Sequence, residues 1–361
     1  MTRATESPMQ TPLTGRVAVV AGATRGAGRG IARALGEAGA TVYCTGRSVA
    51  GQPSPYRQPE TIDETAASIV AGGGAATAVR VDHTVEAEVR ALFERIEEEH
   101  GRLDVLVNSI AGEDPILGGW DPLWKVKLDN AEAMMRQAVL SHVITAKHAA
   151  ALMLKAASRP PDARSMTDTT GTTGERPSKR HGLIVEVTEN DILMSGGHVL
   201  TQLVKTSLKV LATIYATDLR PHGIAAISIT PGFLRSERML ERFGVTESNW
   251  RDGAKKDKNF LESESPIFVG RAVVALATDP DVMKRSGHLF SSWELGREYG
   301  FTDADGRRPD WGMSDLDFSV VPKSIRTMMR HSLELQRDWL KVLSARTDSY
   351  ITKWSDGLKG A

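Results

Sequence analysis

Short apolar runs alternate with longer helical patterns from Arg16 to about His288. The short runs are rich in β-branched residues, and several are almost continuously apolar, as expected of strands covered on both faces. In the longer segment Val85–His100, apolar residues recur at i, i+3, i+4 and i+7, the spacing of one helix face. This alternation predicts an α/β domain with a parallel sheet wrapped by helices. The expected strands are Val17–Ala21, Thr41–Thr45, Ala76–Val81, Val105–Asn108, Leu183–Thr188 and Ile224–Ile229.

Three stretches fall outside this pattern. Gly51–Pro59 carries three prolines and predicts a surface loop after the second strand. Residues 157–181 are rich in Ser, Thr, Pro, Gly and charge, which is typical of a mobile insertion. Beyond Trp311, helical spacing returns in Lys323–Leu343. We therefore expect a flexible leader over 1–13, a single domain over 14–311 that contains the insertion 157–181, and a helical tail over 312–361.

The composition of the chain argues against several classes of function. Hydrophobic residues make up 41% of the 361 residues, enough for a full core, and 45 basic residues balance 45 acidic ones. A neutral chain argues against a nucleic-acid partner, because such proteins usually carry a basic field. The single cysteine, Cys44, excludes an internal disulfide, and no His, Asp or Glu grouping has metal-binding spacing. Without an apolar leader or a membrane-length apolar run, we expect a cytoplasmic protein with no membrane partner and no metal.

A glycine-rich loop follows the first predicted strand directly. It reads Gly22-Ala23-Thr24-Arg25-Gly26-Ala27-Gly28 and opens into a helix. Glycines allow a tight turn and let the backbone approach a pyrophosphate, while the helix N-terminus supplies free N–H groups and a positive dipole end. This context predicts a dinucleotide site.

The residues at the end of the second strand indicate whether the site binds NAD(H) or NADP(H). An acidic residue there would hold the ribose 2′-hydroxyl of NAD(H). The chain instead has Gly46-Arg47-Ser48, and Arg25 lies within the glycine loop. Guanidinium groups pair with a 2′-phosphate that a carboxylate would repel. We therefore expect NADP(H) to be preferred over NAD(H).

Four motifs in order resemble the short-chain dehydrogenase/reductase family. They are the spacing Gly22-x-x-x-Gly26-x-Gly28, Asp82 after the third strand, Asn108-Ser109-Ile110-Ala111-Gly112, and Pro231-Gly232 after the sixth strand. Residues 291–311 also resemble the ending of a bacterial subgroup. The resemblance implies a Rossmann-type doubly wound sheet of about seven strands, a small-molecule substrate, and a homodimer or homotetramer.

The family resemblance also implies a catalytic segment, from which this chain departs. In the family, a lysine lies four residues after a tyrosine on the same helix face and lowers the pKa of that tyrosine. A serine thirteen residues before the tyrosine orients the substrate carbonyl. Lys205 matches the lysine; Thr201 and Thr188 stand where the tyrosine and serine are expected. An aliphatic alcohol is a much weaker acid than a phenol, whose pKa is about 10. The implied cofactor-binding residues are Gly22, Thr24, Arg25, Gly26, Gly28, Arg47, Ser48, Asp82, Asn108, Ala111, Gly112, Lys205, Pro231 and Gly232.

Three nearby residues are candidates to replace the lost acid. His198 precedes Thr201 by three positions, and Glu189 and Asp191 follow Thr188 in a loop. The helix asparagine that positions a water near the lysine in the family is also not evident. Its expected region, Met134–His142, offers Gln137, Ser141 and His142 instead.

These features favour an NADP-dependent oxidoreductase with an altered acid/base site, which reduces a C=O, C=N or conjugated C=C bond. Two alternatives stay open: a non-redox cyclisation or isomerisation on the same scaffold, and a non-catalytic NADP-binding subunit. The segment after Pro231-Gly232 contains Met239, Phe243, Trp250 and Phe260. It indicates an apolar lid and a fairly hydrophobic substrate, unless these side chains only pack the lid onto the domain.

Overall fold

The computed structural model describes residues 11–52, 58–111, 123–158, 182–189 and 199–312. Its centre is a seven-stranded parallel sheet with the strand order β3-β2-β1-β4-β5-β6-β7. This confirms the predicted Rossmann-type α/β fold. The strands are β1 (Val17–Ala21), β2 (Thr41–Gly46), β3 (Ala75–Arg80), β4 (Val105–Asn108), β5 (Gly182–Val187), β6 (Ile224–Thr230) and β7 (Leu289–Ser291).

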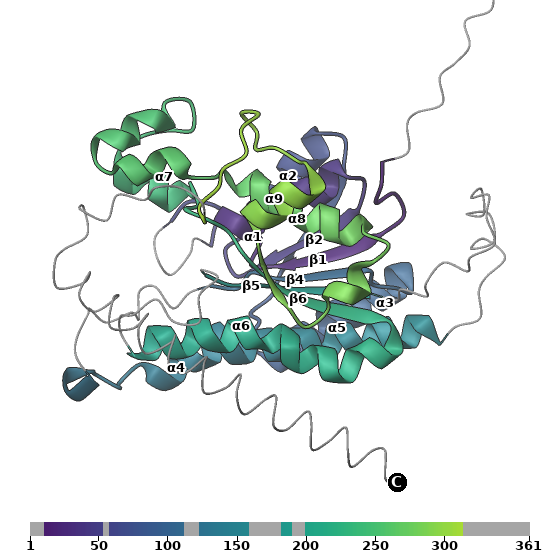
Figure 1. The fold of residues 1–361 in the computed structure, drawn as a ribbon. Helices are drawn as coiled ribbons and strands as arrows, with labels where there is room; N and C mark the ends of the chain where they lie inside the picture. The colour runs from purple at the N-terminus through teal and green to yellow at the C-terminus, as the bar shows by residue number, and fades with distance from the viewer. Residues whose placement is uncertain (1–10, 53–57, 112–122, 159–181, 190–198, 313–361) are drawn as a thin grey trace, which may run out of the picture.

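Helices cover both faces of the sheet, which is why the central strands are apolar on both sides (Figure 1). One face packs against α1 (Gly26–Glu37), α2 (Ile62–Ala71) and α8 (Pro266–Thr278). The other face packs against α3 (Glu86–His100), α5 (Ser141–Ala157) and α6 (Val199–Leu219). The two resulting cores fix the sheet between them, so the loops at its carboxyl edge start from rigid positions.

Shorter elements complete the chain. A helix α4 (Ala131–Met135) continues through a π-helical turn, η2 (Arg136–Leu140), into α5. Between β6 and β7 lie α7 (Glu237–Phe243), the 3₁₀ turns η5 (Trp250–Lys255) and η6 (Lys258–Glu262), α8, and the turn η7 (Val282–Arg285). Helix α9 (Ser292–Tyr299) follows β7, while the 3₁₀ turns η1 (Leu123–Lys125) and η4 (Arg220–His222) precede α4 and β6.

The predicted strand boundaries agree with the structure to within one residue, and the predicted helix Val85–His100 begins one residue later, at Glu86. Four predictions lie mostly outside the described residues: the leader, the loop Gly51–Pro59, the insertion and the helical tail. Among the described helices, none is both long enough and apolar enough to cross a membrane.

Candidate active site

The strand order reverses direction between β1 and β4. Chain connections run outward from β1 through β2 to β3 on one side, and from β4 through β5 to β7 on the other. In open α/β sheets, ligands bind at the carboxyl ends of the strands beside such a switch point. The glycine loop, the loop after β4 and the loop after β5 all start from this edge.

The glycine loop is shaped by close backbone contacts. Gly22 has φ of 86°, in the left-handed region, and its N–H donates to the Thr45 carbonyl at 2.9 Å. A Cβ atom on Gly22 would collide with the Ser109 carbonyl, and one on Gly28 would collide with the Gly22 carbonyl. The loop therefore requires glycine at both positions before any ligand is considered.

The N-terminus of α1 already binds an anion from within the chain. The Gly26 N–H donates to Glu237 Oε2 at 2.8 Å, and Glu237 Oε1 lies 3.6 Å from the Arg29 guanidinium. A carboxylate at a helix N-terminus exploits the same unpaired N–H groups and dipole that a phosphate would. The position is thus chemically suited to a phosphate oxygen.

Two arginines flank the carboxyl end of β2. Arg47 Nη1 lies 3.8 Å from Asp82 Oδ2, and Arg25 pairs with Glu60 at 3.4 Å and hydrogen bonds to Gln58. Burial alone would raise the pKa of Asp82, but hydrogen bonds from Thr84 and the Arg47 charge outweigh it, so this pKa is lowered. Thr24 and Ser48, the sequence neighbours of Arg25 and Arg47, are buried.

In the segment predicted to be catalytic, a carboxylate lies beside Lys205. Lys205 Nζ lies 3.1 Å from Glu189 Oε2, and the Thr188 hydroxyl makes a long contact of 3.4 Å with the Lys205 carbonyl. Thr201 is half-buried one turn before Lys205 on α6, so the two side chains share a face of the helix. His198 and Asp191 lie outside the described residues.

The loop after β4 is held by buried side chains. Asn108, the last residue of β4, is fully buried and donates from Nδ2 to Glu186 Oε1 at 2.7 Å. Ala111 is exposed at the end of the described segment, and Gly112 lies outside it. In the region expected to supply an asparagine, the structure has the π-helical turn η2, followed by the buried Ser141 and His142.

After β6, the backbone of Gly232 is bound by a buried acid, Glu264. The Gly232 N–H and the Ser292 hydroxyl both donate to Glu264 Oε2, at 3.0 Å and 2.5 Å. Burial raises the pKa of Glu264 to about 8, against the lowering effect of these two hydrogen bonds; nearby Asp303 raises it further and Arg235 lowers it. This carboxyl group is the kind of buried titratable residue that tends to occur at functional sites.

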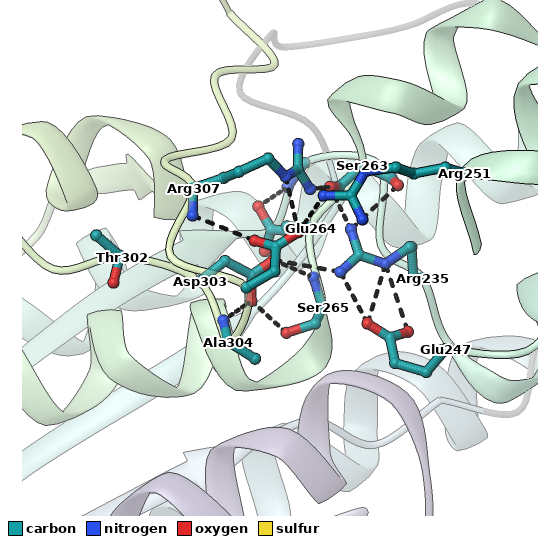
Figure 2. Close-up of polar contacts among 12 residues, drawn as sticks. Arg235, Glu247, Arg251, Ser263, Glu264, Ser265, Thr302, Asp303, Ala304 and Arg307 are labelled. Atoms are coloured by element: carbon teal, nitrogen blue, oxygen red, sulfur yellow. Dashed lines mark hydrogen bonds and ion pairs between the residues drawn. The ribbon is translucent and has the colours of Figure 1, made fainter. Parts of the chain in front are cut away.

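A salt-bridge cluster fixes the segment between Gly232 and Glu264 (Figure 2). The fully buried Arg235 donates to Glu247 at 2.9 Å, to the Ser263 carbonyl at 2.6 Å and to Asp303 at 3.4 Å. Its guanidinium also stacks 4.1 Å above the Trp250 ring. The buried charge of Arg235 is thus paired by groups from several segments of the chain. These contacts anchor the segment between Gly232 and Glu264 to the domain.

The aromatic residues of this segment mostly pack on one another. Phe260 and Trp250 are 0% and 3% exposed, and Phe243 stacks on Phe260 with ring centroids 4.2 Å apart. Phe260 and Trp250 therefore form the lid's own core and are not available to a substrate. Met239 and Phe243 are only half-buried, so they remain candidates to border a substrate.

Four carboxylates of this site escaped the sequence prediction or ranked low in it: Glu186, Glu189, Glu237 and Glu264. Glu189 was a candidate because it follows Thr188, and Glu186 left a second signal, because a charge inside the apolar strand Gly182–Val187 predicts a buried, paired group. The contacts of Glu237 and Glu264 join distant segments and have no local pattern. Among the described residues, no group of three His, Cys, Asp or Glu side chains could hold a metal ion.

Comparison with known proteins gives consistent results. Residues 16–159 match the family model described as short chain dehydrogenase. The mouse protein "Dehydrogenase/reductase SDR family member 1" is 35% identical over 304 residues, which cover 83% of this chain and 86% of that protein. The human protein of the same name is 33% identical over 303 residues, with the same coverage.

Solved structures share the fold at lower identity. A short-chain dehydrogenase from Mycobacterium thermoresistibile superposes with a TM-score of 0.63 at 20% identity, covering 84% of this chain and 94% of that chain. An NADPH-dependent reductase involved in bacilysin biosynthesis superposes with a TM-score of 0.56 at 18% identity, covering 76% and 96%. At such identities the likeness concerns the fold alone.

Proposed function

The chain belongs to the short-chain dehydrogenase/reductase family, and we propose that it is an NADP(H)-dependent oxidoreductase with an altered acid/base site. Its substrate is a fairly hydrophobic small molecule with a C=O, C=N or conjugated C=C bond. The observation that carries the proposal is the contact of 3.1 Å between Lys205 Nζ and Glu189 Oε2, one helical turn from Thr201. Lys205 and Glu189 together hold a proton that can be given to the substrate, whereas Thr201 has no phenol group that could donate one.

The residues present fit a dinucleotide. The glycine loop forms a cradle that a Cβ atom would fill, and the Gly26 N–H already binds a carboxylate that can stand in for a phosphate oxygen. The residues proposed to bind the cofactor are Gly22, Thr24, Arg25, Gly26, Gly28, Arg47, Ser48, Asp82, Asn108, Ala111, Gly112, Lys205, Pro231 and Gly232.

The preference for NADP(H) over NAD(H) rests on Arg25 and Arg47. Both guanidinium groups are partly exposed near the end of β2, with side-chain exposures of 24% and 29%. Each can turn from its present carboxylate partner to a 2′-phosphate, for which planar guanidinium groups are well suited.

Reduction of a carbonyl requires one hydride at carbon and one proton at oxygen. The reduced nicotinamide supplies the hydride when it is bound. We propose that the Thr188 hydroxyl donates a hydrogen bond to the substrate oxygen. Lys205 and Glu189, which lie 3.1 Å apart, then deliver the proton, either directly or through the Thr201 hydroxyl. His198 remains a second candidate for this step. An imine or enone, which needs a weaker acid, fits this site better than a simple ketone.

The loss of a phenol at position 201 also favours a second function. A chain that keeps the glycine loop and Lys205 but has Thr201 suits a non-redox cyclisation or isomerisation, or a non-catalytic NADP-binding subunit.

Oxidation of NADPH with a panel of ketones, enones and imines tests the proposal, with wild type and Thr201→Tyr compared. Turnover by wild type, with deuterium passing from 4-deuterated NADPH to product, supports a reductase. Product without consumption of cofactor favours the non-redox reading. Tight binding of NADPH without turnover of any substrate favours the non-catalytic subunit. Turnover by Thr201→Tyr alone means that carbonyl reduction is not the natural reaction.

A further inference from the structure

A buried polar cluster lies beneath the loop after β4, formed by Asn108, Glu186 and His142. Each residue is 0% exposed. Asn108 and Glu186 are direct neighbours in the register of β4 and β5. His142 Nδ1 lies 2.6 Å from Glu186 Oε2. Burying a carboxyl group inside a sheet costs free energy unless its oxygens are paired, and here each oxygen of Glu186 has a partner.

The protonation of this cluster follows from its geometry. His142 Nε2 lies 3.0 Å from the Ile110 carbonyl oxygen, which can only accept, so Nε2 must carry a hydrogen. Nδ1 then either donates to an ionised Glu186 or accepts from a protonated one. In both cases one proton is shared and the pair is neutral as a whole. The ring is therefore held with its Nε2–H directed at the Ile110 carbonyl.

A second side chain from the same helix binds the next residue of the loop. Gln137 Nε2 lies 3.4 Å from the Ala111 carbonyl, a longer contact. In an α-helix, positions 137 and 142 would lie about 140° apart around the axis. The π-helical turn Arg136–Leu140, in which the Ser141 N–H donates to the Arg136 carbonyl, brings residues five apart towards one face. The turn is what lets both side chains reach consecutive carbonyls.

The other side of this loop packs on the glycine loop. The Ser109 N–H donates to the Ala21 carbonyl at 2.8 Å, and the Ser109 carbonyl leaves no room for a Cβ atom on Gly22. The loop is thus clamped between the glycine loop and the π-helical turn. In the proposed function, Arg25 and Arg47 bind the 2′-phosphate of the adenosine half near β2. The nicotinamide half therefore lies on the β4 side of the switch point, where this loop and its exposed residue Ala111 are found.

We propose that His142 and Gln137 are positioning residues, which fix the backbone of the loop after β4 and so align the nicotinamide half of the dinucleotide. Glu186 and Asn108 hold the His142 ring in the orientation that this requires. The inference rests on the proposed function, because it presupposes that a dinucleotide binds at this edge. Neither residue exchanges a proton with the substrate in this role.

Calorimetric titrations with NADPH and with 2′,5′-ADP, which lacks the nicotinamide half, test the inference. His142→Phe keeps a ring but loses both hydrogen bonds, and it should weaken NADPH binding about tenfold while 2′,5′-ADP binding stays within about twofold. His142→Gln, which retains a donor for the Ile110 carbonyl, should recover part of the loss. His148→Phe is the matched control: His148 lies on the same helix but pairs with Glu86, so both affinities should be unchanged.

Two further measurements keep the inference falsifiable if His142→Phe folds poorly. Gln137→Leu, at a half-buried position, should reproduce a smaller version of the same selective loss. Amide hydrogen exchange at Ile110 and Ala111 should be faster in both variants even without cofactor. Equal weakening of NADPH and 2′,5′-ADP, or unchanged exchange in this loop, would overturn the inference. Failure of wild type to bind NADPH would instead contradict the proposed function and leave the exchange test to decide the positioning role.

Discussion

At the scale of single residues, carboxylates hold several groups of the candidate site in place: Glu189 Oε2 lies 3.1 Å from Lys205 Nζ, and Glu264 Oε2 accepts a hydrogen bond from the Gly232 N–H. Thr188, Thr201 and Lys205 could be named only through the family resemblance, by counting back from the lysine of its motif; in the structure Thr188 follows β5, and Thr201 and Lys205 lie on α6. The contact of Glu189 with Lys205 depends on how a loop folds back, and that of Glu264 with Gly232 joins segments 32 positions apart. Neither follows from local periodicity.

Arg47 offers a direct test of cofactor preference. Arg47→Asp places a carboxylate where we propose the 2′-phosphate, and it should weaken NADPH binding by at least about tenfold while NADH binding is retained or improved. The ratio of the two dissociation constants is the measurement. Arg90→Asp, an exposed change on α3, should leave that ratio as it is in wild type. An unchanged ratio in Arg47→Asp would mean that the 2′-phosphate lies elsewhere.

Glu264 predicts how stability depends on pH. Its folded pKa of about 8 exceeds the ordinary 4.5, so between these values the folded state binds more protons than the unfolded state. Stability contributed by this group is therefore complete below pH 4.5 and is lost as pH rises towards 8, at up to about 1.4 kcal/mol per pH unit. Glu264→Gln cannot titrate, so its stability relative to wild type should increase from pH 5 to pH 8.5.

Urea unfolding at both pH values measures this difference. Glu241→Gln, at an exposed position on α7, serves as the control and should show the pH dependence of wild type. If Glu264→Gln runs parallel to wild type across the range, the carboxyl group is ionised in the folded protein at neutral pH.

At the scale of elements, most of the fold could be predicted and the irregular parts could not. Six strands were visible because buried parallel strands are short, β-branched and apolar on both faces. The seventh, β7, has only three residues and lacks a pattern of its own. The π-helical turn had no signal either, since the segment around it has ordinary helical composition. In the structure, Gln137 and His142 contact consecutive carbonyls of the loop after β4 from this part of the helix.

The glycine loop gives a prediction at this scale. Gly28→Ala introduces a Cβ atom against the Gly22 carbonyl, so the turn must open. We expect a loss of stability of about 1–3 kcal/mol and a marked loss of NADPH affinity. Gly72→Ala, where a Cβ would have only ordinary contacts, should leave affinity unchanged. Wild-type affinity in Gly28→Ala would show that the loop's tight geometry is not needed for the ligand.

At the scale of the whole molecule, we propose a homodimer or homotetramer. Leu203, Val210 and Ile214 are 50%, 39% and 54% exposed and lie along one stripe of α6, an apolar surface that an isolated chain would leave in water. Light scattering after gel filtration should give at least twice the monomer mass of 39.1 kDa. Val210→Asp with Ile214→Asp should lower the mass. A monomeric wild type at tens of micromolar would contradict the proposal.

The connection between α5 and β5 has a consequence for handling the protein. Helix α5 ends at Ala157 and β5 begins at Gly182, at the amino edge of the sheet, whereas the candidate site lies at the carboxyl edge. The two described ends of this connection therefore lie on the side of the sheet opposite the candidate site. A fluorophore attached at the exposed Ser158, after a Ser158→Cys change, would lie at the opposite edge of the sheet from the proposed dinucleotide site.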